Sequence, residues 1–101
     1  MNQDIVFELE LTPEFIKDYQ KLVKKNKLLV KFFEKALVLL TQNPKHNSLR
    51  SHKVDTIDNF DVWSSSVTGD IRIIWTYGQN QKMVIVLLES GTHSGANKVY
   101  K

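Results

Sequence analysis

Two histidines, one arginine and one aspartate stand out in this chain, because together they could cut the phosphodiester backbone of RNA. They are His52, Asp70, Arg72 and His93. RNA carries its own nucleophile, the 2′-OH, so a protein must supply a base for that hydroxyl, an acid for the leaving 5′ oxygen and a cation for the phosphorane. Histidine suits the first two roles because its reference pKa of about 6.5 populates both protonation states near neutrality. Arginine suits the third because its planar guanidinium stays charged and can donate two hydrogen bonds to phosphate.

Each of these four residues also has a simpler interpretation. His52 could be a solvated loop residue, and His93 could belong to a surface turn. Arg72 is the single charge of the segment IRIIW, so it either pairs with a carboxylate such as Asp70 or faces an open groove. Asp70 itself follows a glycine, a setting in which aspartate is common in turns. The sequence leaves these alternatives open.

The histidines of the chain do not form a metal-binding motif. His46, His52 and His93 are separated by six and forty-one positions, and the chain has no cysteine. This spacing matches no compact ligand set. The sequence also lacks a glycine-rich phosphate loop and a serine nucleophile elbow. We therefore expect a chemistry without a metal ion or another cofactor, and we interpret His46 as a turn residue.

The distribution of charge predicts an anionic partner. The formal net charge is +3, yet residues 17–53 carry ten basic and two acidic residues, whereas the rest of the chain carries four basic and nine acidic residues. Arg50 and Lys53 are expected to bind phosphate, and Trp63 and Tyr100 could stack on RNA bases. The alternative is a pair of helices whose lysines face solvent, with both aromatic rings used for packing.

Length and composition predict one domain over residues 1–101. A chain of 101 residues can build one modest core, and its 42% hydrophobic and 25% charged residues are typical of a globular protein. The absence of cysteine favours a reducing compartment, so we expect a cytoplasmic protein. The N-terminal segment MNQDIVFELELT lacks the features of an export signal, and no apolar run approaches the roughly 18–20 residues of a membrane span.

Hydrophobic periodicity predicts a strand followed by two helices. Residues 5–11 alternate apolar and acidic side chains, which is typical of a half-buried strand. Thr12-Pro13 opens a helix, because threonine can cap it and proline is tolerated at its first position. Asn26 separates this helix from a second one, which it could cap and which ends before Asn43-Pro44. The apolar stripes of the two helices comprise Phe15, Ile16, Tyr19, Leu22 and Val23, and Leu28, Leu29, Phe32, Phe33, Ala36, Leu37 and Leu40.

The second half of the chain predicts an antiparallel meander. Residues 44–59 are expected to be irregular, whereas residues 60–67, 71–77 and 83–89 are expected to form three strands joined by short turns. The last of these strands is apolar on both faces, so we place it in the centre of the sheet. A meander covered on one face by the αα-hairpin gives an α+β fold.

The ordered set of segments resembles the RelE/ParE superfamily of type II toxins. A strand and a basic αα-hairpin beginning LTPEFIKDYQKL are followed by LRSHKV, GDIRIIW and VIVLLESGTHS. The resemblance covers nearly the whole chain and is greatest to the RelE/YafQ-like mRNA interferases. It implies a compact microbial-RNase-like fold, metal-independent cleavage of mRNA in the ribosomal A site, and neutralisation by an antitoxin protein encoded beside the toxin. It also implies that the toxin–antitoxin complex binds operator DNA through the antitoxin.

The resemblance also implies roles for residues of this chain. His52 in LRSHKV matches a histidine that takes part in acid–base chemistry in YafQ-like members, and His93 matches the histidine of their GTH motif. Asp70 matches the aspartate that opens the penultimate strand. Arg72 matches the arginine of RelE-like members that holds the phosphate. Which histidine is the acid and which the base stays open.

The chain departs from the YafQ-like pattern at two places. Trp63-Ser64 stands where those members often carry another histidine. The family's closing aromatic position is Asn97 here, and the first aromatic residue after GTH is Tyr100. Two alternatives therefore remain, a ParE-like toxin that inhibits DNA gyrase by binding and an inactive homologue that binds RNA or the ribosome. The two histidines and the arginine favour the nuclease, because a pure binder does not need them.

Overall fold

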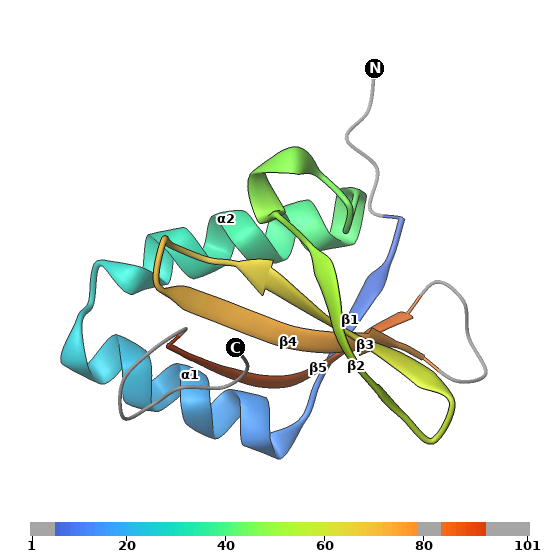
Figure 1. Ribbon diagram of the computed structural model, residues 1–101. Coiled ribbons are helices and arrows are strands. Elements are labelled where there is room, and N and C mark those ends of the chain that lie inside the picture. Colours follow the sequence, from blue (N-terminus) through green and yellow to red (C-terminus); the bar gives the residue numbers. More distant parts are fainter. Residues whose placement is uncertain (1–5, 79–83, 93–101) are drawn as a thin grey trace.

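The protein, described here from a computed structural model, is a five-stranded sheet with two helices packed on one of its faces (Figure 1). The structure describes residues 6–78 and 84–92. The strand order is β1-β5-β4-β3-β2. The elements are β1 Glu8–Leu11, α1 Pro13–Lys25, α2 Leu29–Gln42, the 3₁₀ helix η1 Asn47–Leu49, β2 His52–Ile57, β3 Phe60–Ser66, β4 Ile71–Tyr77 and β5 Val84–Thr92. The predicted α+β class, with a strand, a helical hairpin and then an antiparallel meander, is confirmed.

Helix α1 begins where the sequence predicts, at a threonine cap followed by a proline. The Phe15 amide donates to the Thr12 hydroxyl oxygen at 3.2 Å, and that hydroxyl donates to the Leu87 carbonyl at 2.7 Å. Farther along the helix, the Ser90 amide donates to the Asp18 carboxylate at 3.0 Å. Because β1 pairs with β5 only as far as Leu87, α1 supplies the hydrogen-bond partner that a strand would otherwise give the next part of β5.

The start of α2 differs from the prediction. The residue that precedes the helix is Leu28, whose side chain makes no capping hydrogen bond, so Asn26 is not its cap. The Asn26 side-chain oxygen instead accepts from the Leu28 amide at 3.1 Å, which closes a local turn between the helices. The helix ends at Gln42, before Asn43-Pro44, as predicted.

The prediction that residues 44–59 are irregular is wrong over its second half. Residues His52–Ile57 form β2, which pairs antiparallel with β3. The two strands are joined by Asp58 and Asn59, whose φ angles of 51° and 70° are both positive. Two-residue hairpin loops favour this left-handed geometry, and Asp and Asn tolerate it without a glycine. The connection contains no glycine and no proline, which is why the hairpin was not recognised from the sequence.

The last strand is central, as its apolar character on both faces predicts. Strand β5 pairs antiparallel with β4 on one side and parallel with β1 on the other. The core lies between the helices and the sheet, and Trp75, Ile73 and Phe33 are fully buried in it. Among the described residues, no helix is long and apolar enough to cross a membrane.

Candidate functional site

Arg72 lies on the sheet face that the helices leave uncovered. Ile71, Ile73 and Trp75 of β4 belong to the core under the helices, and side chains alternate along a strand, so Arg72 faces the opposite side. It is nevertheless only 8% exposed. In the register of the sheet, Arg72 pairs with Ser66 of β3 on one side and with Gly91 of β5 on the other.

Neutral groups of β3 and of the segment before β2 hold the Arg72 guanidinium. Nε donates to the Ser64 hydroxyl at 2.8 Å, and Nη1 donates to the Ser66 hydroxyl at 2.8 Å. Nη2 lies 3.3 Å from the carbonyl oxygens of both Ser64 and Arg50. Neither of the two alternatives stated for Arg72 describes what the structure shows. In residues 6–78 and 84–92 no carboxylate pairs with the guanidinium, and serine hydroxyls and backbone carbonyls occupy its surroundings. The side chain is fixed in place, and no described residue neutralises its positive charge.

The structure brings His52 to this arginine. The His52 Nδ1 atom lies 3.3 Å from Arg72 Nη2 and 3.2 Å from the Arg50 carbonyl oxygen. His52 is exposed, as the first residue of β2. The pair therefore combines a fixed cation with an imidazole that solvent or a ligand can reach.

The electrostatic environment of Arg72 favours an anion. Burial lowers the pKa of Arg72 from its ordinary value, and the positive charge of Arg50 lowers it further. Both effects act against the charged form, and a guanidinium still remains protonated near neutral pH. A phosphate that bound there would relieve both, since it would pair with the buried charge and with the exposed Arg50.

A short 3₁₀ helix positions the Arg50 backbone. The His46 Nδ1 atom accepts from the Ser48 amide at 3.0 Å and so caps η1. Arg50 ends η1 in the left-handed region, with φ 48°. The Ser51 hydroxyl is 2.6 Å from the Pro44 carbonyl, to which it donates. These contacts fix the segment that leads into His52, and they give His46 the structural role expected of a turn residue.

The other predicted site residues lie in different surroundings. Asp70 is exposed in the turn before β4, where its amide donates to the Thr68 hydroxyl at 3.1 Å. Lys53 follows His52 in β2, but its ammonium is 3.7 Å from the Asp61 carboxylate. Because both side chains of that ion pair are about half exposed, 54% and 51%, the pair is weak and a phosphate could compete for the lysine.

Trp63 is partly buried against the core. Its ring stacks on Trp75 with a centroid distance of 5.9 Å and an interplanar angle of 17°. The Lys45 ammonium lies over the same ring, 3.9 Å from its centroid. Among the described residues the Trp63 indole N–H has no hydrogen-bond partner. An RNA base that stacked on Trp63 would therefore have to take the place of Lys45.

Two predicted site residues, His93 and Tyr100, lie outside the described residues. Strand β5 is described as far as Thr92. In register, Gly91 of β5 is the partner of Arg72. The structure therefore relates Arg72 to the segment that precedes His93, and the role of His93 itself stays a prediction.

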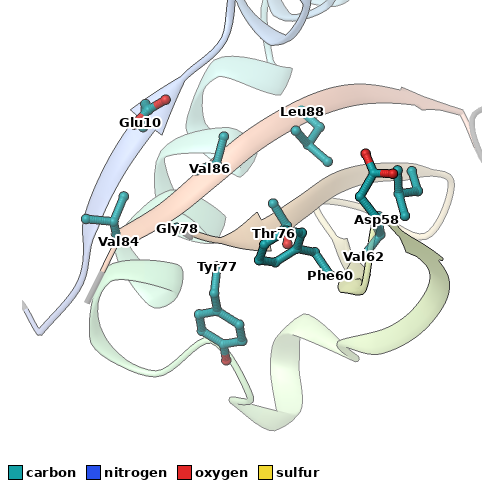
Figure 2. Close-up of a pocket in the computed structure, with 11 residues that line it drawn as sticks. Glu10, Asp58, Phe60, Val62, Thr76, Tyr77, Gly78, Val84, Val86 and Leu88 are labelled. Atoms are coloured by element: carbon teal, nitrogen blue, oxygen red, sulfur yellow. The ribbon is translucent and has the colours of Figure 1, made fainter. Parts of the chain in front are cut away.

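A groove occupies the same open face of the sheet, toward the other end of β4 (Figure 2). Its volume is about 570 Å³. The floor and walls are largely apolar, and the two charged groups among its described lining residues are both carboxylates, Glu10 and Asp58. Figure 2 shows Glu10 on β1 and Asp58 in the turn between β2 and β3, at separate sides of the groove. The groove is lined by Glu10, Ile57, Asp58, Phe60, Val62, Thr76, Tyr77, Gly78, Val84, Val86 and Leu88.

Solved structures with the same arrangement of helices and strands are toxins. An archaeal RelE–RelB complex from Pyrococcus horikoshii OT3 matches at a TM-score of 0.70 with 18% identity, covering 90% of this chain and 99% of that chain. The toxin of the E. coli DinJ–YafQ complex matches at 0.67 with 18% identity, covering 88% and 94%. A YoeB/ParE toxin from Agrobacterium tumefaciens matches at 0.69 with 15% identity, covering 87% and 100%. The chain has the fold of the RelE/ParE toxins.

The identities to these RelE-like structures are low, so the likeness concerns the fold. No protein-family model matches the chain, and no curated protein sequence matches it. The fold expected from the ordered sequence segments is thus confirmed by structure alone. The chemistry must be argued from the residues that the RelE-like scaffold of this chain brings together.

Sequence reasoning missed two residues that hold the candidate site. Ser64 and Ser66 alternate along β3 and so share a face of the sheet, on which they meet Arg72. The signal was present in the segment FDVWSSSV, since three serines in a strand are unusual where one face is buried. Only the pairing register of β3 with β4 connects them to the arginine.

Proposed function

We propose that this chain is the toxin of a type II toxin–antitoxin system and that it cleaves mRNA on the ribosome through attack of the RNA 2′-OH. The observation that carries the proposal is the buried Arg72 beside His52. Serines and carbonyl groups hold it, and no carboxylate in the described part of the chain neutralises its charge. A structural arginine buried to this degree is normally paired with a carboxylate. A phosphate-binding arginine binds its ligand more strongly without a carboxylate partner, because the incoming phosphate then becomes its counter-charge.

In this proposal Arg72 stabilises the phosphorane. Nη1 of Arg72 carries two hydrogens and donates one to Ser66, so the other is available to a phosphate oxygen. His52 and His93 form the acid–base pair, and Asp70 orients a histidine or a nucleotide. The product carries a 2′,3′-cyclic phosphate or its hydrolysed form. Arg50 and Lys53 add positive charge around the phosphate, and Trp63 and Tyr100 are candidate stacking surfaces for bases.

The lysine-rich helical hairpin supports an RNA or ribosome partner. The lysines of α1 and α2 and of their connection are exposed, and in the described part of the chain none of them forms an ion pair. They are Lys17, Lys21, Lys24, Lys25, Lys27, Lys31 and Lys35. Unpaired lysines on a rigid surface favour a polyanion, because each phosphate contact releases a counterion. We expect binding to ribosomes to weaken steeply as salt is raised.

The groove on the open face supports an antitoxin partner. Two of the similar structures are complexes, RelE with RelB and YafQ with DinJ. An antitoxin segment that filled the groove of this chain would need apolar side chains for its floor and basic side chains for Glu10 and Asp58. Because the groove shares a sheet face with Arg72, such a segment would lie beside the candidate catalytic cluster. Binding of the resulting complex to operator DNA would then come from the antitoxin.

The proposal is tested by incubating the purified protein with programmed ribosomes and mapping mRNA ends by primer extension. Wild type should cut in the A site, and Arg72→Ala should lose roughly 10²–10³-fold in rate, as expected for loss of one transition-state donor. His93→Ala should also lose cutting. Gln20→Ala, on the exposed side of α1, is the matched control and should cut like wild type.

Three results would contradict this function. Full activity in Arg72→Ala would remove the arginine from the reaction, provided that the variant is folded by circular dichroism. Cutting that survives in His93→Ala would move the acid–base chemistry to other residues. An absence of cuts on ribosomes and on free mRNA, with inhibition of DNA supercoiling by gyrase, would support the ParE-like alternative instead.

A further inference from the structure

The Nδ1 atom of His52 has two neighbours that require opposite protonation states of it. The Arg50 carbonyl oxygen, at 3.2 Å, can only accept a hydrogen bond, so it requires a proton on Nδ1. Arg72 Nη2, at 3.3 Å, can only donate, so it requires a lone pair there. Which neighbour prevails decides the tautomer of the neutral ring, and the tautomer decides which chemistry His52 can perform.

The hydrogen bonds available to Arg72 resolve this conflict. Nη2 carries two hydrogens, and two backbone carbonyls, those of Ser64 and Arg50, lie 3.3 Å from it. Both hydrogens are used if each goes to one carbonyl. The Arg50 oxygen has two lone pairs, so it can accept from Arg72 and from His52 Nδ1 at the same time. In the opposite arrangement Nη2 would spend a hydrogen on the imidazole and leave one of these two carbonyls without it.

The backbone conformation of Arg50 is what aims this carbonyl. Its φ of 48° lies in the left-handed region, which L-residues other than glycine adopt at a cost. Here the cost is met by the capped 3₁₀ helix before it and by the Ser51 hydroxyl, which donates to the Pro44 carbonyl. The surroundings of Arg50 thus hold an uncommon backbone conformation that places its carbonyl next to the His52 imidazole.

We infer that the Arg50 carbonyl fixes His52 in the tautomer with its proton on Nδ1, which leaves the lone pair of Nε2 as the proton acceptor. Arg50 is then a positioning residue that acts through its backbone carbonyl. In other sites a carboxylate accepts the hydrogen bond that orients the histidine. In the reaction, Nε2 takes the proton of the RNA 2′-OH while the 2′ oxygen attacks phosphorus, and the ring becomes an imidazolium with both nitrogens protonated. The bond from phosphorus to the 5′ oxygen then breaks, and the acid of the proposed function gives a proton to that leaving oxygen. The role of base rests on the proposed function, whereas the tautomer does not.

The charged groups around His52 agree with this assignment. In the described part of the chain, the charged side chains that flank or face His52 are those of Arg72, Arg50 and Lys53, all of them positive. Its cross-strand partner is the neutral Ser64. No carboxylate among the described residues hydrogen-bonds to the ring, so the orientation of the imidazole falls to the Arg50 carbonyl.

The tautomer can be read directly, without RNA. We expect long-range ¹H–¹⁵N spectra of the ¹⁵N-histidine-labelled protein, recorded where His52 is neutral, to show a protonated Nδ1 and an unprotonated Nε2. His46 provides an internal comparison of the opposite kind, because its Nδ1 accepts from an amide and must be unprotonated. A His52 signal with a protonated Nε2 would overturn the inference.

A pair of variants separates the Arg50 backbone from its side chain. Arg50→Gly and Arg50→Val both remove the guanidinium, but glycine adopts the left-handed conformation readily and the β-branched valine resists it. We expect the glycine variant to keep the Nδ1 tautomer and the valine variant to lose it. The valine variant should also cut mRNA roughly 10²-fold more slowly than the glycine variant, the lower end of what acid–base catalysis contributes.

The outcomes distinguish this inference from the function on which the base role rests. Equal tautomers and equal rates in the two folded variants would overturn the role of the Arg50 carbonyl, even if the protein is a nuclease. If Arg50→Val fails to fold by circular dichroism, the wild-type and Arg50→Gly spectra alone decide, and loss of the Nδ1 tautomer in Arg50→Gly overturns the inference. A protonated Nδ1 in a protein that cuts no RNA would refute the proposed function and leave the tautomer standing.

Discussion

At the scale of single residues, the candidate site depends on hydroxyl groups that satisfy a buried cation. Ser64 is 3% exposed and receives the Arg72 Nε hydrogen. Replacing it by alanine removes the acceptor of that buried donor. We expect Ser64→Ala to lower the free energy of unfolding by about 1–3 kcal/mol, the range for leaving a buried donor without its partner. Urea denaturation measures this loss, and the exposed Ser48 of η1 gives the control Ser48→Ala. Equal stability of the two variants would show that Ser64 does not hold the arginine.

The residues with chemical roles were predictable to different degrees. Arg72 and His52 could be chosen from residue type and from the segments GDIRIIW and LRSHKV, and the structure places them 3.3 Å apart. The serines that hold Arg72 could not, because their contact depends on how β3 registers against β4. The carbonyl of Arg50 could not be predicted either, since a positive φ at arginine has no sequence signature.

A second residue-scale feature is a carboxyl group whose ionisation opposes folding. Burial raises the pKa of Glu89 above its ordinary value of 4.5, and the charges of Asp18 and Glu14 raise it further. The folded protein thus binds this proton more tightly than the unfolded chain does. Glu89 therefore contributes stability below pH 4.5, and that contribution is lost as the pH rises through the folded pKa.

Glu89→Gln should consequently be more stable than wild type at pH 7, and the difference should shrink as the pH falls toward about 4. The glutamine is neutral at every pH, so the folded protein does not have to bury a charge at pH 7. Its contribution to the free energy of unfolding also does not rise as the pH falls. Unfolding in urea between pH 4 and pH 8 measures both curves. A stability difference that stays constant over this range would show that the effect of the substitution is not ionisation.

At the scale of elements, the hairpin of β2 and β3 contributes residues both to the site around Arg72 and to the groove. His52 lies at its start, and Ile57, Asp58 and Phe60 line the groove at its tip. The sequence predicted the helices from their regular apolar period, and β5 from its continuous apolar run. It did not predict β2, whose six residues are mostly exposed and whose turn has no glycine. An edge strand with little burial leaves only a weak pattern.

The left-handed turn of this hairpin can be tested at Asn59, where φ is 70°. Asn59→Val should lower the free energy of unfolding by about 1–2 kcal/mol, because a side chain branched at Cβ clashes in that conformation. Asn59→Gly should not destabilise the protein, since glycine has no Cβ. Thermal unfolding of the two variants measures the contrast. If valine were tolerated as well as glycine, the turn would have a different backbone geometry.

At the scale of the whole molecule, positive and negative charge occupy different surfaces. The helical hairpin presents exposed lysines, and the Arg72 cluster adds two arginines. Among the described residues, the groove on the open face has Glu10 and Asp58 as its charged lining groups. RNA phosphates are attracted to the first two surfaces and repelled by the third. A partner segment in the groove would therefore not compete with RNA for the same charges, although it would lie on the same sheet face as Arg72.

This separation predicts what kind of peptide the groove selects. From a random peptide library displayed on phage, wild type should enrich sequences that combine large apolar residues with lysine or arginine. These peptides should bind Glu10→Lys roughly tenfold more weakly, a change of about 1.4 kcal/mol, because one attraction becomes a repulsion. Glu8→Lys makes the same charge change two positions away on β1, outside the groove lining, and should bind like wild type. Enrichment of acidic peptides, or equal binding by the two variants, would show that the carboxylates of the groove do not select its occupant.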